Sequence, residues 1–392
     1  MIHRARTFAL ACLLVLAGAC QAGPEAAAPS ATPSPVAGGT PQDCAQQTLA
    51  RLTAKERIGQ LIFVGLIGNQ LGPAERAAIE ANSVGSVWFT DFSSAPVASV
   101  AQVSAQVQAL ASPAAPHVGF LIGANQEGGQ IDQFRGPGFS PIPSALQQGA
   151  EDPAALQTQA ALWAAQLKAA GINLDLAPVM DTVPAGQDAS NAPIGALQRE
   201  FGHDPVTVST HGLAFIAGMH QSNVLVTLKH FPGLGRVAGN TDFSSAVVDR
   251  TTMATDPYLV PFQQGINAGA DMVMVSTATY TQIDAQHLAV FSPAIMIDLL
   301  RNQLHFGGVV VSDDLGAAAA VASIPAGDRA VDFIAAGGDL VTVKNANLVA
   351  PMTTAIANRV ASDSVFADHV NAAVTRVLQL KIRAGLVSCA VP

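Results

Sequence analysis

Charged and aromatic side chains are scarce in this sequence. Charged residues make up 12% of its 392 residues, and it holds only two tryptophans and two tyrosines. The charges sum to −9, which argues against a nucleic-acid partner because binding to phosphates requires a positively charged surface. Lysine and arginine form no continuous basic run, so the sequence also offers no polybasic patch for a membrane surface.

Several catalytic signatures are missing as well. The sequence contains no Walker loop, no HExxH and no GxSxG element, which argues against the chemistries that these motifs support. The Gly-Leu-Gly at 233–235 is too short to be a dinucleotide fingerprint. The nine histidines form no group at metal-ligand spacing. We therefore expect neither a metal ion nor a cofactor.

Cysteine is rare, with four residues in the chain, which excludes a small disulfide-rich scaffold. Near the start, Arg4 and Arg6 precede an apolar run from Phe8 to Leu16, and small residues then lead to Cys20. This pattern is typical of a secretory signal and is too short to span a bilayer. We expect a signal peptide over residues 1–20 with a lipobox and lipidation of Cys20. An ordinary cleaved signal with an incidental cysteine is the alternative.

Residues 21–43 are rich in Ala, Pro, Ser and Gly and contain no core-forming run. That composition predicts a semi-extended tether. A tether behind a lipid anchor suits an exported lipoprotein of a bacterial cell envelope. We expect a monomer that contacts the membrane through its N-terminal lipid only.

The two remaining cysteines, Cys44 and Cys389, lie at the two ends of the region that follows the tether. Chain termini are often close in space, and an exported protein meets an oxidising compartment. The sequence therefore favours a disulfide between them, with two free thiols as the alternative.

Apolar runs alternate with helix-like stretches from residue 44 to residue 392. The runs are almost continuously hydrophobic, as parallel strands buried on both faces are. This alternation predicts a single α/β domain, a (β/α)8 TIM-like barrel over residues 44–392. The expected strands are 61–65, 86–90, 117–123, 172–178, 224–230, 271–276, 308–314 and 339–343.

Polar residues follow the carboxyl ends of several of these runs. In barrels of this class, the carboxyl ends of the strands carry the active site. Paired carboxylates at such a rim indicate glycoside chemistry. The polar residues are Asn125, Glu127, Asp175, Asp181, Lys229, His230, Ser276, Asp313 and Asp314.

Four segments together resemble the catalytic barrel of glycoside hydrolase family 3, and in particular its bacterial β-N-acetylglucosaminidases. They are NQEGGQIDQFRGPGFSPIPSA (125–145), NAPIGALQREFGHDP (191–205), LKHFPGLG (228–235) and FGGVVVSDDLGAAA (306–319). Their order and spacing agree with the family, and the similarity runs from about Thr53 to Gly385. The resemblance implies a TIM barrel that hydrolyses glycosides with retention.

The resemblance also assigns roles to individual residues. Asp313, the first aspartate of the Ser-Asp-Asp-Leu segment, matches the nucleophile of the family, while Asp314 suits a helix N-cap. Arg199, Lys229 and His230 match positions that hydrogen-bond sugar hydroxyls and the 2-substituent. Asn125 stands where the family has an aspartate that binds the distal hydroxyls, so a charge-assisted contact is lost there.

The loop after 228–235 departs most from the family. An Asp-Ser-His element supplies the general acid/base in these relatives, but aligning Asp242 with its aspartate places Ser244 where the histidine should be. A serine hydroxyl has far too high a pKa to protonate a leaving group near neutrality. Asp242 itself, another loop group or an incoming phosphate remain as candidates, and so does a barrel that binds glycan without turnover.

We therefore expect a glycosidase that removes terminal β-linked N-acetylglucosamine, or a related β-sugar, from cell-wall or chitin-type fragments. A catalytically impaired or inactive glycan-binding surface lipoprotein of the same fold is the alternative. A structural lipoprotein that has lost sugar binding is a third reading. A long aromatic platform for polymeric glycan is not expected from so few tryptophans and tyrosines. Trp88 is the one aromatic residue we place near the rim, where simple packing would explain it equally well.

Overall fold

The computed structural model describes residues 40–111 and 118–389. The expected signal peptide, Cys20 and the tether up to residue 39 lie outside these ranges. The described residues belong to one compact unit, Gly39–Pro392. Among them, no helix is both long enough and apolar enough to cross a membrane.

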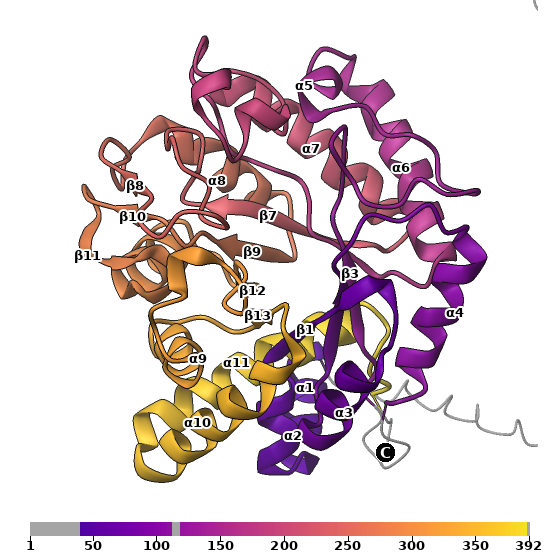
Figure 1. Cartoon of the computed structure of the whole chain (residues 1–392), viewed down its shortest axis with the longest axis vertical. Coiled ribbons are helices and arrows are strands. Elements are labelled where there is room, and N and C mark those ends of the chain that lie inside the picture. Colours follow the sequence, from indigo (N-terminus) through magenta and orange to yellow (C-terminus); the bar gives the residue numbers. More distant parts are fainter. Residues whose placement is uncertain (1–39, 112–117, 390–392) are drawn as a thin grey trace, which may run out of the picture. The chain divides into compact units, whose positions relative to one another are not determined.

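The centre of the domain is a sheet of eight strands in the order β12-β9-β7-β6-β3-β2-β1-β13, and its strand pairs are parallel (Figure 1). Each strand overlaps the apolar run expected to form it, and β1, β3 and β7 each end one residue beyond that run. The residues of these strands are buried, as strands covered on both faces should be. The strands are β1 (Ile62–Leu66), β2 (Ser86–Phe89), β3 (Leu121–Ala124), β6 (Leu174–Asp175), β7 (Leu225–Phe231), β9 (Met272–Val275), β12 (Val309–Ser312) and β13 (Val341–Val343).

The two outer strands of this order meet and close the sheet into a barrel. Val311 of β12 forms a parallel bridge with Leu340, which directly precedes β13. The Ser312 amide donates to the Leu340 carbonyl at 3.0 Å, and the Thr342 hydroxyl donates to the Ser312 carbonyl at 2.7 Å. Closure removes the free strand edges, and the expected (β/α)8 TIM-like barrel is confirmed.

Helices surround the strands (Figure 1). Two of the longest begin with an aspartate cap followed by proline: Asp152 precedes α6 and Asp204 precedes α7, and each carboxylate accepts from backbone amides of the first turn. The helices are α1 (Pro41–Arg51), α2 (Ala54–Gly59), α3 (Pro73–Asn82), α4 (Val97–Gln108), α5 (Ala145–Gln148), α6 (Pro153–Ala169), α7 (Pro205–Gln221), α8 (Val260–Asn267), α9 (Ala326–Ala335), α10 (Val349–Ser362) and α11 (Ser364–Arg383). A π-helical segment, Ala294–Gln303, precedes β12.

Short strands shape the loops at the carboxyl ends of the barrel strands. They form a hairpin after β3 and a small three-stranded sheet beside β7 and β9. They are β4 (Gln126–Gly128), β5 (Ile131–Asp132), β8 (Val248–Asp249), β10 (Thr279–Tyr280) and β11 (Asp284–Leu288).

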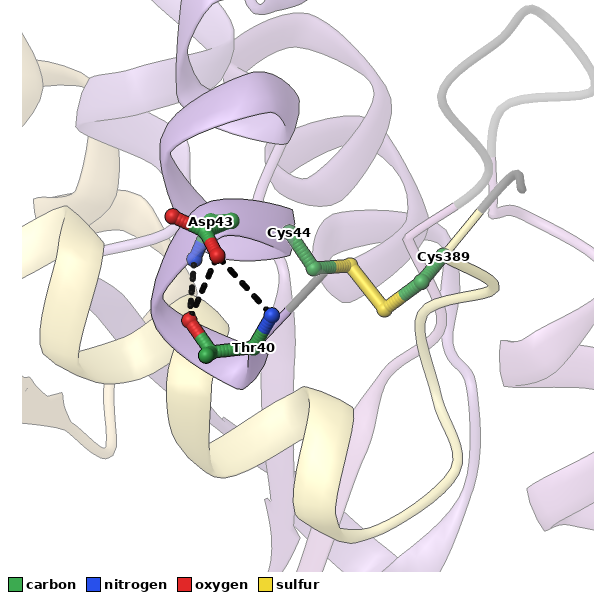
Figure 2. The surroundings of a disulfide bond; sticks show 4 residues. All are labelled: Thr40, Asp43, Cys44 and Cys389. Carbon is green, nitrogen blue, oxygen red and sulfur yellow. Dashed lines mark hydrogen bonds between the residues drawn. A yellow bond between two sulfur atoms is a disulfide. The ribbon is translucent and has the colours of Figure 1, made fainter. Parts of the chain in front are cut away.

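The folded domain begins earlier than the composition indicated. Residues 41–43, assigned to the tether in the sequence analysis, form the first turn of α1. The Thr40 hydroxyl and the Asp43 carboxylate cap this turn reciprocally, with bonds of 2.9 Å and 3.2 Å to backbone amides (Figure 2). Thr40 and the residues after it therefore belong to the folded domain, because a capping box with proline at the first helical position starts a helix.

A disulfide joins the two ends of the domain. Cys44 lies in α1 and Cys389 follows α11, and their Cα atoms are 5.5 Å apart (Figure 2). This is the pairing expected from the sequence. The bond closes a span of 345 residues, which restricts the unfolded chain and so favours the folded one.

Candidate active site

A cavity of about 520 Å3 opens at the carboxyl ends of the barrel strands. Every catalytic and substrate-binding residue expected from the sequence lines this cavity, although the residues come from segments far apart in the chain. They are Asn125, Arg199, Lys229, His230, Asp242 and Asp313. The fold thus brings the expected site together; what each residue does there follows from its contacts.

The base of the cavity contains a buried ion-pair cluster, which we call the pocket floor (Glu127, Arg199 and Lys229). Arg199 makes two bonds of 2.8 Å to the Glu127 carboxylate, one from Nε and one from Nη2. Lys229 Nζ lies 2.5 Å from Glu127 Oε1 and donates to Asn125 Oδ1 at 2.9 Å. One carboxylate therefore holds two cations in fixed positions below the cavity.

The charges of the pocket floor determine its protonation. Burial alone would raise the pKa of Glu127, but Arg199 and Lys229 outweigh burial and hold that pKa at about 2. Burial lowers the pKa of Lys229, and the negative charge of Glu127 opposes this shift. Glu127 is thus a permanent anion at neutral pH, and it fixes the donor groups that point into the cavity.

His230 is held by a buried aspartate, Asp181, which follows β6. The Asp181 carboxylate lies 2.8 Å from His230 Nδ1 and also accepts the backbone amides of His230 at 3.2 Å and Leu234 at 2.8 Å. A carboxylate at Nδ1 keeps the proton on that nitrogen. The other ring nitrogen, Nε2, lies 3.5 Å from Arg199 Nη2, so the imidazole is oriented beside the pocket floor.

Asp313 and its neighbour Asp314 have different environments. The Asp313 amide donates to the Val275 carbonyl at 3.0 Å, which continues the sheet past β12, and its half-buried carboxylate lines the cavity. The Asp314 carboxylate accepts three backbone amides, from Gly316 at 2.7 Å, Lys344 at 3.0 Å and Ala317 at 3.1 Å. Asp314 therefore fixes the turn, as a capping residue does, and Asp313 remains available for chemistry.

The lip of the cavity is the β7–β8 loop (232–247). Its Thr241 and Asp242 carbonyls accept the amides of Ala320 at 3.2 Å and Ala319 at 3.1 Å, so the segment that follows Asp313 holds the loop beside the cavity. Ser244, which we expected at the position of the family histidine, is absent from the described residues that line the cavity. The loop thus presents Asp242, and not Ser244, to a bound molecule.

Asp242 has a pKa raised toward neutrality, as a general acid requires. Enclosure by the surrounding protein and the nearby negative charge of Asp313 raise its pKa to about 6, against the opposing effect of His230 and Arg199. The residue is nonetheless exposed to solvent at the lip, and no described residue hydrogen-bonds to its carboxylate. The carboxyl group is therefore able to exchange protons near neutral pH.

Two exposed aromatic rings, Phe92 and Phe243, stand on the rim of the cavity, with 63% and 83% of their surface exposed. Trp88 also lines the cavity, but it is buried and tilted against Phe63 at 6.4 Å between ring centroids. Trp88 is therefore part of the core as well as part of the wall. The exposed phenylalanines are the aromatic surfaces that a ligand extending beyond the cavity would meet.

Sequence reasoning placed Glu127 and Asp181 at the rim without assigning them a function. Their partners, Arg199 and His230, lie 72 and 49 residues away. Both acids follow buried apolar runs, and that position is the one signal that could have identified them. Taken together, the cavity combines the carboxylate of Asp313, the carboxyl group of Asp242 with its pKa of about 6, and a floor rich in hydrogen-bond donors.

Known proteins are similar to this chain over most of its length. Residues 53–380 match the family model described as the glycosyl hydrolase family 3 N terminal domain. The chain is 36% identical over 309 residues to a β-hexosaminidase of Xanthomonas euvesicatoria pv. vesicatoria (strain 85-10), and the match covers 76% of this chain and 88% of that protein.

Solved structures are similar over most of the described fold. A β-N-acetylhexosaminidase from Beutenbergia cavernae DSM 12333 superposes with a TM-score of 0.83 at 46% identity, covering 85% of this chain and 99% of that one. A glycoside hydrolase family 3 β-N-acetylglucosaminidase from Paenibacillus sp. str. FPU-7 gives a TM-score of 0.77 at 27% identity, covering 86% of this chain and 63% of that one.

Proposed function

Because the chain belongs to glycosyl hydrolase family 3, we propose that it is a retaining β-N-acetylglucosaminidase in which Asp313 is the nucleophile and Asp242 is the acid/base. The observation that carries the proposal is the convergence of Asp313 and Asp242 on one cavity above the pocket floor. The relatives compared above are a β-hexosaminidase, a β-N-acetylhexosaminidase and a β-N-acetylglucosaminidase.

The reaction proceeds in two steps. An oxygen of Asp313 attacks C1 of the sugar while the bond from C1 to the leaving oxygen breaks, and Asp242 gives its proton to that oxygen. The product is a sugar ester of Asp313. Asp242, now a carboxylate, takes a proton from water as the water attacks C1, and the ester bond to Asp313 breaks. The sugar leaves with its original configuration.

The remaining groups bind the terminal sugar. Arg199 and Lys229 bring donors that Glu127 holds in place, while His230 and Asn125 offer further donors and acceptors to hydroxyls and to the 2-acetamido group. A cavity of about 520 Å3 lies in the size range of sites for small ligands. A site of that size suits one terminal sugar rather than an extended polymer.

The location of the enzyme belongs to the same proposal. The signal-like segment, the lipobox cysteine Cys20 and the Ala/Pro-rich tether support an exported, lipid-anchored enzyme. An enzyme at that place would meet peptidoglycan fragments released during wall turnover. Intact mass of the mature protein tests the anchor, since a lipidated Cys20 adds the mass of its acyl chains and an unmodified mature chain contradicts it.

The activity is tested with a panel of aryl β-glycosides, with and without phosphate, using wild type and Asp313→Ala. We expect release of the aryl group from the N-acetylglucosaminide by wild type and none above background by the variant. Equal rates in both proteins would contradict the proposal. Saturable binding of wall fragments without product would instead support the alternative of a glycan-binding protein, and a rate that depends on phosphate would identify phosphorolysis.

A further inference from the structure

Three potential metal ligands, Asp188, Glu200 and His203, lie together outside the active-site cavity. One donor atom of each lies within 4.8 Å of the others, and His203 Nδ1 is 3.5 Å from Asp188 Oδ1. Within residues 40–111 and 118–389, no other group of three His, Cys, Asp or Glu side chains converges in this way. The sequence analysis found no such group, because the fold and not the spacing brings Asp188 to the other two.

The environment of Glu200 is the second observation. Its side chain is fully buried, and neither carboxylate oxygen has a hydrogen-bond partner among the described residues. The Asp188 oxygen that faces His203 is also inaccessible and without a hydrogen bond there. A buried carboxylate is normally hydrogen-bonded, paired with a cation or bound to a metal, because its desolvation is costly. As an anion, Glu200 therefore lacks the compensation that its burial requires.

We propose that Asp188, Glu200 and His203 bind a divalent transition-metal ion of the Zn2+ type. Zinc accepts imidazole nitrogen and carboxylate oxygen at about 2.0–2.2 Å, so two ligands of a tetrahedral ion are about 3.4 Å apart. The observed 3.5 Å between His203 and Asp188 fits this separation. An imidazole ligand favours a transition metal over Mg2+ or Ca2+, which prefer oxygen ligands alone.

The competing arrangement replaces the ion with protons. Burial and the adjacent Asp188 raise the pKa of Glu200 to about 7, so a proton shared by the two carboxyl groups would remove the unfavourable charge. In that arrangement, His203 Nδ1 carries a proton and donates to the Val183 carbonyl, which lies at the long distance of 3.3 Å. Only the first arrangement contains a metal ion, so a measurement of metal content distinguishes the two.

The proposed ion would join two segments that carry active-site residues. Asp188 lies on the loop that follows β6 and begins near Asp181, the partner of His230. Glu200 directly follows Arg199 of the pocket floor. The ion would thus position Arg199 and the Asp181 loop relative to each other. It would not touch substrate, since none of its ligands lines the cavity.

The test measures metal content rather than activity, so its outcome does not depend on whether the proposed hydrolase activity is correct. The purified protein with its disulfide intact is stripped with EDTA, incubated with Zn2+ alone and passed through a desalting column. Bound zinc is then measured by inductively coupled plasma mass spectrometry, and the dissociation constant by competition with a chromogenic chelator. The same measurements are made on Glu200→Gln and His203→Asn, which preserve side-chain shape.

We expect one zinc per chain in wild type, with an affinity at least about tenfold weaker in Glu200→Gln and His203→Asn. Zinc should raise the melting temperature of wild type but not of these variants. His287→Asn is the matched control. His287 forms an exposed pair with Asp284 at 2.9 Å, so its substitution should leave zinc binding unchanged. Asp313→Asn should likewise retain the ion.

Three outcomes would overturn the proposal. Wild type that retains no zinc favours the shared proton. Equal affinity in wild type and Glu200→Gln shows that these residues do not bind the ion. Loss of zinc in Asp313→Asn, with retention in Glu200→Gln, places the ion in the active-site cavity instead. Melting curves in EDTA show whether each variant is folded before its zinc content is compared.

Discussion

The pocket floor and the β7–β8 loop face the same cavity but are built differently. In the pocket floor, Glu127 is buried and bonded to both Arg199 and Lys229. In the loop, the exposed Asp242 carboxylate accepts no hydrogen bond from a described residue, and backbone bonds to the segment after Asp313 hold the loop in place. The first region is therefore preorganised for binding, whereas the second leaves a carboxyl group free to exchange a proton.

The difference matters because the two halves of glycoside hydrolysis need different environments. Donors that bind a sugar work best when their positions are fixed before the sugar arrives. A group that gives and takes a proton needs a pKa near the working pH. Partial enclosure beside Asp313 raises the pKa of Asp242 to about 6. The predictions below test this division, from the largest expected effect to the smallest.

Asp313→Ala should abolish turnover, since it removes the carboxylate that both regions serve. We expect kcat for an aryl N-acetyl-β-glucosaminide to fall by about 10^4-fold or more, as removal of a nucleophile does in other enzymes. The pocket floor is left intact, so affinity for N-acetylglucosamine, measured by calorimetry, should be nearly unchanged. A variant that keeps wild-type kcat would show that this carboxylate is not the nucleophile.

Asp242→Asn should impair turnover through the β7–β8 loop. We expect kcat to fall by about 10^2- to 10^4-fold with a poor leaving group, which is the usual contribution of a general acid. The loss in the first step should be smaller for an activated aryl leaving group, which departs without a proton. Ser244→Ala is the matched control on the same loop and should keep wild-type rates. The reverse result, with Ser244→Ala impaired and Asp242→Asn active, would move the chemistry to the serine.

Glu127→Gln should break the pocket floor. It leaves two buried cations without their anion, and breaking such a pair costs about 3–5 kcal/mol of unfolding free energy. Glu80→Gln is the control, since Glu80 pairs with Arg76 at 3.4 Å on the surface, where a pair contributes about 1 kcal/mol or less. Denaturant melts of both variants make the comparison, and equal losses would show that the pocket floor is not a strongly coupled unit.

The low pKa of Glu127 also predicts how acid affects the stability of the fold. The folded pKa of Glu127, about 2, is below its ordinary value of 4.5, so the folded protein binds fewer protons there than the unfolded one. The stabilisation by Glu127 is therefore present above about pH 4.5 and is lost as the pH falls toward 2. Melting temperatures between pH 6 and pH 3 should fall less steeply for Glu127→Gln than for wild type, and parallel curves would contradict this.

The pH dependence of activity reports on the β7–β8 loop. Asp242 must be protonated to act as the acid, and its pKa is about 6. We therefore expect kcat/KM to fall as the pH rises through 6, by about tenfold per unit at higher pH. Asp242→Asn should lose this alkaline limb. Persistence of the limb in that variant would assign it to another group.

The barrel and the site were predictable from the sequence to different degrees. Parallel strands are buried on both faces, so each of the eight strands leaves an apolar run that is visible without any structure. The cavity residues were found through family motifs, each of which is local. The tether boundary was misplaced because a capping box between Thr40 and Asp43 was hidden in a composition typical of linkers.

Contacts between distant segments explain what the sequence did not show. Glu127 of β4 contacts Arg199 across 72 residues and also contacts Lys229 of β7, and no periodicity predicts such contacts. The convergence of Asp188 with Glu200 and His203 is likewise a product of two loops meeting. Asp242 was considered from the sequence as one of several candidates for the acid, and the enclosure that raises its pKa is a property of the folded loop.

The central claim, that Asp313 forms a covalent bond with the sugar, is tested most directly by trapping. Wild type and Asp242→Asn are incubated with a fluorinated N-acetylglucosaminyl fluoride, which forms the sugar ester quickly and hydrolyses it slowly. Proteolysis and tandem mass spectrometry then locate the adduct. We predict one sugar attached to Asp313 in both proteins, with slower release in Asp242→Asn. A sugar on another residue, or turnover without any adduct, would contradict the account.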